Sequence, residues 1–143
     1  GSFNFLLGDA DGDKAVVEAI PGRFCVDRSA QTLVRANHYM CGETIRRSRQ
    51  RLGRKQAAST TSRHRQMAEL LGRYHTKLSP SAARKILTDR SGSWPWIHQF
   101  PDGPDAQTLN VMTIDSLIAV SQDRVLHTCR GSRKPGRWQA LSL

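Results

Sequence analysis

The side chains of Asn37 and Arg63 are the best candidates in this sequence to stabilise a developing negative charge. Asn37 ends a run that is predicted to be extended, and Arg63 closes the stretch Ser59-Thr60-Thr61-Ser62-Arg63 at the predicted start of a helix. A primary amide and a guanidinium are both hydrogen-bond donors, and donors aimed at one point hold the oxyanion of an acyl-transfer reaction. The sequence therefore suggests part of an acyl-transfer site, for which no matching nucleophile stands out.

Each of these residues also has a plainer interpretation. An Asn at a strand end often bridges a turn, and an Arg that precedes His64 and Arg65 at a helix start can simply be surface charge. Cys25, which stands between Phe24 and Val26 in a predicted strand, is expected to be a small core side chain rather than a nucleophile.

The remaining motifs fail at the spacing that their chemistry needs. Asp9-x-Asp11-x-Asp13 resembles the start of an EF-hand loop, but Lys14 stands where Gly is needed and Ile20 stands where Glu is needed. A hairpin turn is the better interpretation. No pair of His and Cys residues has the spacing of a zinc site, and no glycine-rich phosphate loop is present. We therefore expect neither a metal nor a cofactor.

Composition and cysteine number set the frame. A length of 143 residues suits a single domain, residues 1–143, and no apolar run approaches the ~18 residues of a membrane span. The cysteines Cys25, Cys41 and Cys129 are odd in number and lack framework spacing. A reducing interior, and hence a cytoplasmic location, is therefore expected.

The net charge of +10 is concentrated in two segments, of which the first is expected to be a basic loop at residues 40–58. Such a cluster attracts phosphates, nucleic acid or an acidic surface, although a solvated loop is the simplest interpretation. Aromatic side chains do not interleave the arginines, which argues against nucleic acid. The alternative function is therefore a basic, non-catalytic module that contacts nucleic acid or an acidic protein through Arg46–Lys55.

Alternation and turn signals predict an antiparallel β-meander in the first third of the chain. Its strands are expected at residues 3–8, 14–20, 23–27 and 32–37, with Asp11-Gly12 and Pro21-Gly22 in the turns.

Two helices are predicted to follow, and then more strands, which makes the fold α+β. The first helix is expected over Thr61–Tyr74, capped by Ser59, Thr60 or Thr61, and the second starts with Ser79 as cap and Pro80 at its first position. Residues 89–105 are expected to form a loop that carries Trp94 and Trp96. The closing strands are predicted at residues 109–114, 116–120, 124–129 and 138–141.

The order of these features resembles the acyl-coenzyme A:6-aminopenicillanic acid acyltransferase family, a branch of the N-terminal-nucleophile hydrolases. The resemblance covers nearly the whole chain. The chain looks like the C-terminal half of a protein of that family. Four stretches carry it: the hairpin Asn4-Phe5-Leu6-Leu7-Gly8-Asp9-Ala10-Asp11-Gly12 with Val17-Glu18 and Pro21-Gly22, then Ala36-Asn37-His38-Tyr39, then Ser59-Thr60-Thr61-Ser62-Arg63, and finally Leu87-Thr88-Asp89 with Thr113-Ile114-Asp115-Ser116-Leu117-Ile118. Ala36, Tyr39 and Thr60 depart from the Thr, Phe and Ser of the family's pattern.

The resemblance implies a fold and a mechanism. The fold is the C-terminal portion of an αββα sandwich, and the reaction cleaves an amide C–N bond through an acyl-enzyme. Asn37 would donate its amide N–H to the oxyanion, and Arg63 would be the cation of the site. The nucleophile is a Cys whose own α-amino group serves as base. It is expected on an upstream half of the same protein, as a separate chain or segment, so this chain alone is expected to be inactive.

The same resemblance guides the expected substrate contacts. His38, Tyr39, Trp94 and Trp96 are the candidate substrate-binding residues, although His38 can be structural and the tryptophans can simply anchor their loop. The expected substrate is a small acylated amine or an acyl-CoA. Hydrolysis and acyl transfer both remain open.

Overall fold

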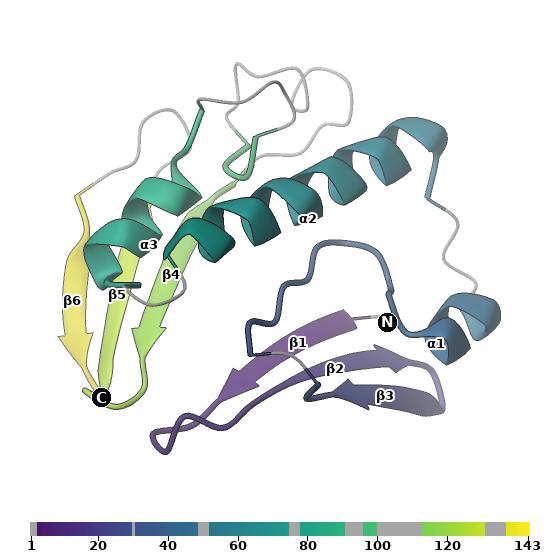
Figure 1. The fold of residues 1–143 in the computed structure, drawn as a ribbon, viewed down its shortest axis with the longest axis horizontal. Helices are drawn as coiled ribbons and strands as arrows, with labels where there is room; N and C mark the ends of the chain where they lie inside the picture. Colours follow the sequence, from purple (N-terminus) through teal and green to yellow (C-terminus); the bar gives the residue numbers. More distant parts are fainter. Residues whose placement is uncertain are drawn as a thin grey trace. The chain divides into compact units, whose positions relative to one another are not determined.

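The computed structural model is of the mixed α+β class. It describes residues 3–29, 31–48, 52–74, 78–90, 96–99, 113–130 and 137–143. Within these residues lie two three-stranded antiparallel sheets and three helices (Figure 1). The chain divides into two compact units, residues 1–65 and residues 66–143, and each is described by itself. No helix in this part of the chain is long and apolar enough to cross a membrane.

The first sheet confirms the first three predicted strands. Its order is β1 (Phe3–Gly8), β2 (Lys14–Ile20) and β3 (Arg23–Asp27), all antiparallel. Gly12 and Gly22 have φ values of 92° and 76° in the two connecting turns, a backbone conformation that is available to glycine without steric cost. The Asp-Gly and Pro-Gly signals therefore set the hairpins, and with them the register of the sheet.

The aspartates between β1 and β2 close the first hairpin. The Asp9 carboxylate accepts hydrogen bonds from the backbone N–H groups of Asp11, at 3.0 Å, and Asp13, at 2.9 Å. This is an Asx-type turn, as the hairpin interpretation predicted.

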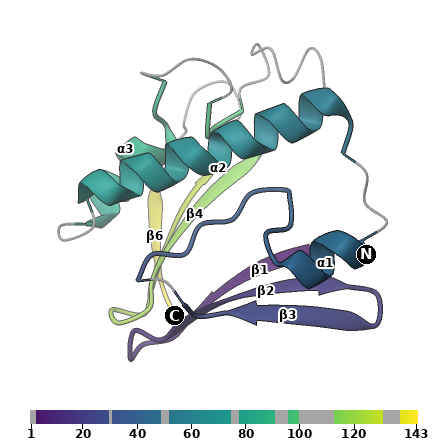
Figure 2. The same ribbon diagram turned by 45° about the vertical axis from the view of Figure 1, so that its right-hand side comes forward.

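The two faces of the first sheet differ. One face lies under α1 (Gly42–Arg47) and the loop that precedes this helix (Figure 2). The opposite face is apolar, and its large side chains are between 45% and 70% exposed: Phe3, Phe5, Leu7, Phe24 and Val26.

The predicted fourth strand, Thr32–Asn37, is wrong, because these residues form a loop. Backbone groups here bind side chains rather than a neighbouring strand: the Asn4 side-chain amide donates to the carbonyls of Ala36, at 2.7 Å, and His38, at 3.2 Å. The β-rich composition of the segment was therefore overridden by side-chain partners that only the folded chain provides.

The cysteines also differ from expectation. Cys25 and Cys41 form a disulfide across a separation of 16 residues, whereas Cys129 is a buried free thiol. Cys25 is thus a crosslink and not simply a core side chain. The spacing in sequence gave no sign of this pair, because the loop between them brings Cys41 back over β3.

The range 40–58, expected as a basic loop, is helical where α1 lies and again from Arg54 onward. Helix α2 spans Arg54–Tyr74, so it begins about two turns earlier than the predicted Thr61. Ser59 and Thr60 are therefore buried inside the helix instead of capping it. The extra turns begin with good helix formers at residues 54–58, but they lack the apolar periodicity on which the prediction relied. The helix crosses the boundary between the two units.

The second unit confirms the second predicted helix. Helix α3 (Pro80–Leu87) starts with Pro80 in its first turn, and the Ser79 hydroxyl accepts from the Ala82 N–H at 3.2 Å. The helix packs against a sheet of β4 (Asp115–Val120), β5 (Val125–Arg130) and β6 (Gln139–Ser142) (Figures 1 and 2).

Three of the predicted closing strands are thus confirmed. Of the predicted strand 109–114, residues 109–112 lie outside the described residues, and Thr113 and Ile114 are not in a strand. The Thr113 N–H instead donates to the Gln99 carbonyl at 2.8 Å.

Candidate functional site

Thr60 connects the loop of Asn37 to the helix of Arg63. Its hydroxyl oxygen accepts from the Asn37 backbone N–H at 2.7 Å and lies 3.1 Å from Nδ1 of His38. Thr60 is 2% exposed and stands one helical turn before Arg63, on the same side of α2. The structure therefore brings the two sequence-predicted residues into one neighbourhood, although Arg63 lies well inside its helix and not at the helix start.

The Asn37 side chain is exposed, while the backbone on both sides of it is bound. The side-chain amide is thus open to a substrate and stands on a fixed backbone, and an oxyanion donor must be in place before charge develops. Arg63 is half-buried on α2. Its guanidinium stays charged at any physiological pH.

The surroundings of His38 disfavour the charged form of its ring. Burial lowers the pKa of His38 below its ordinary 6.5, and the nearby charges of His64, Arg35 and Arg63 lower it further, against an opposing effect of Glu18. The His38 and His64 rings meet edge to face with centroids 5.5 Å apart. Nδ1 of His38 and the Thr60 hydroxyl share a hydrogen bond, so the ring has a structural bond in addition to its position beside Asn37.

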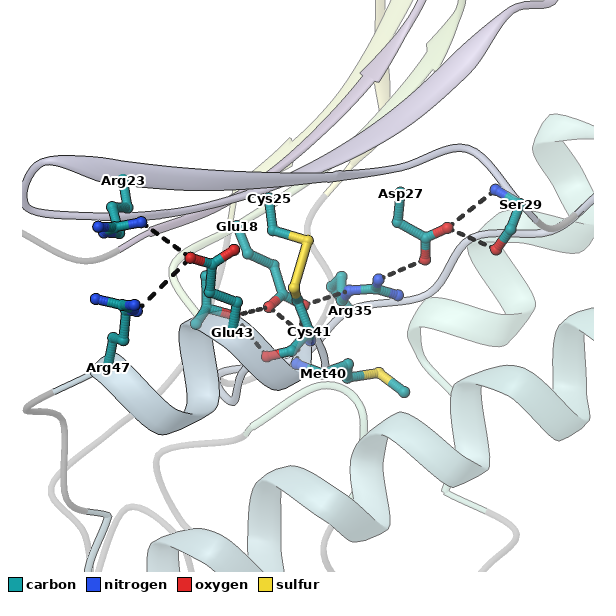
Figure 3. The surroundings of a disulfide bond; sticks show 11 residues. Glu18, Arg23, Cys25, Asp27, Ser29, Arg35, Met40, Cys41, Glu43 and Arg47 are labelled. Carbon is teal, nitrogen blue, oxygen red and sulfur yellow. Dashed lines mark hydrogen bonds and ion pairs between the residues drawn. A yellow bond between two sulfur atoms is a disulfide. The ribbon is translucent and has the colours of Figure 1, made fainter.

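Glu18 is a buried carboxylate that binds the segment around Asn37, and sequence reasoning did not select it. It is 1% exposed. It accepts from Arg35 Nε at 3.0 Å, Met40 N at 2.9 Å, Cys41 N at 3.0 Å and the Thr44 hydroxyl at 2.7 Å (Figure 3). Burial alone would raise its pKa, but the hydrogen bonds from Thr44, Cys41, Met40 and Arg35 together hold the pKa below the ordinary 4.5.

Arg35 lies between two carboxylates. Besides Glu18, it binds Asp27 through Nη2 at 2.7 Å. The hydrogen bonds of Ser29 and then that of Arg35 lower the pKa of Asp27 to about 2. A lone acidic residue within the otherwise apolar stretch Ala15–Ile20 was the available sequence signal for this network, because an unpaired charge is almost never buried.

Two of the candidate substrate-binding residues border one hollow. His38 and Tyr39 line a cavity of about 200 Å³ together with Ile45, Ser48 and Leu52. The Tyr39 hydroxyl donates to the Ala19 carbonyl at 3.2 Å, which fixes the ring as part of the cavity wall.

The tryptophans are placed differently. Trp96 belongs to the second unit, where the Arg90 guanidinium lies 5.1 Å from the centre of its ring. Trp94 lies outside the described residues. Their proposed contact with substrate stays a prediction.

The described residues show which chemical groups this site holds. No group of three or more His, Cys, Asp or Glu side chains in them could hold a metal ion. In the described part of the first unit both cysteines are joined in the disulfide, so no free thiol lies there.

The fold is mixed α+β, and its candidate site is a pair of donors on a loop and a helix. A family model described as acyl-coenzyme A:6-aminopenicillanic acid acyl-transferase matches residues 1–132. The chain belongs to this family, which relates it to acyltransferase enzymes. Searches of the curated proteins and of the solved structures found no match.

Proposed function

We propose that this chain supplies the oxyanion-stabilising part of an N-terminal-nucleophile amide hydrolase or acyltransferase. The observation that carries the proposal is Thr60, which ties the Asn37 backbone to the helix of Arg63. Membership of the acyltransferase family supports the same conclusion.

Each residue has a defined role in this proposal. A Cys thiolate, supplied by an upstream segment or chain, attacks the carbonyl carbon of an amide, and its α-amino group takes up the thiol proton and passes it to the leaving amine. The Asn37 side-chain amide donates to the resulting oxyanion, and Arg63 stabilises the negative charge near the nucleophile. Loss of the amine leaves a thioester, which water hydrolyses or a second amine takes over.

The cavity beside His38 and Tyr39 supports a small substrate group at this position. Its volume of about 200 Å³ is below the roughly 300–1,000 Å³ of typical ligand pockets. We therefore propose that it takes one part of an acylated amine or acyl-CoA, with the upstream half forming the other wall. Trp94 and Trp96 are proposed to add to the substrate contacts.

The exposed apolar face of the first sheet supports the αββα fold that the resemblance implies. Large side chains such as Phe24, which is 70% exposed, are rarely left in contiguous patches on a finished surface. We propose that a second layer covers this face in the complete protein.

The direct test uses the full open reading frame that contains this chain. The substrates are acylated amines and acyl-CoA esters. We expect Asn37→Ala and Arg63→Ala each to lower kcat by about 10²- to 10³-fold, which is the loss typical of a removed oxyanion donor. Arg73→Ala, an exposed arginine on the same helix, is the matched control and should keep the parent rate. Undiminished turnover in Asn37→Ala would overturn the proposal.

One observation keeps the basic binding module as a second candidate. Arg46, Arg47, Arg54 and Lys55 are all exposed, and Arg47 pairs with Glu43 at 3.6 Å. Binding of nucleic acid or an acidic protein that weakens steeply with salt, and that Asn37→Ala leaves intact, would favour this function.

A further inference from the structure

We infer that Asn4 and Glu18 are positioning residues for Asn37; the inference rests on the proposed role of Asn37 as oxyanion donor. The two residues face each other on β1 and β2, and Cys25 faces Glu18 from β3. Directly opposite residues of an antiparallel sheet share a face and lie about 4.5–5.5 Å apart. The three side chains thus form one row across the sheet, called here the cross-strand row.

Each member of the cross-strand row holds a different point of the Asn37 loop. Asn4 donates to the carbonyls of Ala36 and His38, one on either side of Asn37. A single amide nitrogen therefore holds the peptide group that precedes Asn37 and the one that follows His38.

Glu18 holds the two ends of the same segment. It binds the side chain of Arg35 before Asn37, and the backbone N–H groups of Met40 and Cys41 after it. Cys25 adds a covalent bond to Cys41 (Figure 3).

The arrangement exceeds what packing alone requires. An apolar side chain would cover this face at a lower desolvation cost than a carboxylate that is 1% exposed, since buried ion pairs are often replaceable by apolar residues without loss of stability. The backbone groups of Ala36, Asn37, His38, Met40 and Cys41 are instead bound one by one to side chains. A backbone that is held in this way limits how far the Asn37 side-chain amide can move as the oxyanion forms.

The test is a double-mutant cycle in the full open reading frame. Glu18→Gln keeps the shape of the side chain but removes its charge, and we expect kcat to fall by about 10²-fold, the cost of a displacement of about 1 Å. KM should change by no more than about twofold, because ground-state binding does not use this charge. Glu43→Gln makes the same chemical change at an exposed carboxylate of α1 and should leave kcat at the parent value.

The same substitution is then made in the Asn37→Ala variant. This shows whether Glu18 acts on kcat through Asn37 or through the stability of the whole fold. If Glu18 acts through Asn37, Glu18→Gln should cause almost no further loss there, since residues that act as a unit are strongly non-additive. An equal loss in both backgrounds, or no loss in either, would overturn the inference. If Glu18→Gln does not fold, Asn4→Asp, which replaces the donor with a carboxylate oxygen, is expected to give the same non-additive result.

An independent readout separates this inference from the proposed function. The side-chain amide signals of Asn37 are followed by NMR on the same protein. Glu18→Gln should shift and broaden them, whereas Glu43→Gln should not. If Asn37→Ala keeps full activity, the proposed function fails, and this spectrum still decides whether Glu18 orients Asn37; unchanged signals refute it.

Discussion

The two sheets are covered by different means. In the first unit a loop lies over the sheet and is bound by polar side chains, above all by the buried Glu18. In the second unit α3 buries Ala82 and Ile86, and one polar contact to the sheet, from Arg84 to His127 at 3.1 Å, adds to this apolar packing. A helix satisfies its own backbone groups and needs only apolar contacts, whereas a loop leaves N–H and C=O groups that must find partners.

The comparison shows that buried polar groups lie where a loop, rather than a helix, covers the sheet. The hydrogen-bonded carboxylate and the disulfide both lie beneath the loop that carries Asn37. A surface helix such as α3 is positioned well enough by packing and by its Ser79 cap. An exposed donor on a loop requires fixed points on both sides, and the cross-strand row provides them.

The largest expected change in the free energy of unfolding comes from the polar network of the first unit. Glu18→Ala should lower the free energy of unfolding by about 3–5 kcal/mol, because Arg35 then stays buried with one carboxylate partner fewer. Urea unfolding measures the change. Glu43→Ala, at an exposed pair, should cost no more than about 1 kcal/mol. Equal losses in the two variants would mean that the buried network contributes nothing special.

Reduction of the disulfide should have a smaller effect than loss of Glu18. Opening a loop of 16 residues removes about 3 kcal/mol of stability in the chain-entropy description. The measurement is urea unfolding with and without a reductant. Thiol titration of unfolded, unreduced residues 1–143 should find only Cys129, and three titrating thiols would show that Cys25 and Cys41 are not joined.

The disulfide also bears on the expected location. The prediction of a reducing compartment relied on cysteines without framework spacing, and disulfides are characteristic of oxidising compartments. The cytoplasmic location therefore stays a prediction, and the cysteine pattern on which it relied no longer supports it.

The smallest expected effect is a pH dependence from His38. Its folded pKa lies below the unfolded value, so the unfolded chain binds more protons between the two values. The contribution of His38 to the free energy of unfolding is then fully present above about pH 6.5 and is lost as the pH drops through the folded pKa. The loss is about 1.4 kcal/mol for each unit by which the folded and unfolded pKa values differ. His38→Gln should flatten the slope of unfolding free energy between pH 5 and pH 7. An unchanged slope would assign the dependence to other groups.

Local signals in the sequence determined several elements by themselves. The Asp-Gly and Pro-Gly turns define the strands at residues 3–8, 14–20 and 23–27, and Ser79-Pro80 defines the start of α3. These signals succeed because glycine, proline and capping hydroxyls act on their own neighbours. Asn37 and Arg63 were likewise selected from residue type and resemblance, and their catalytic role stays a proposal.

Only the tertiary structure decided how Asn37 is held. The segment Thr32–Asn37 has the composition of a strand, yet Asn4 and Thr60 take its backbone hydrogen bonds from far along the chain. The bond of Cys25 to Cys41 and the burial of Glu18 depend on the same long-range return of the chain. A pattern in the sequence reports local preference, but partners distant in sequence become known only when the chain folds back on itself.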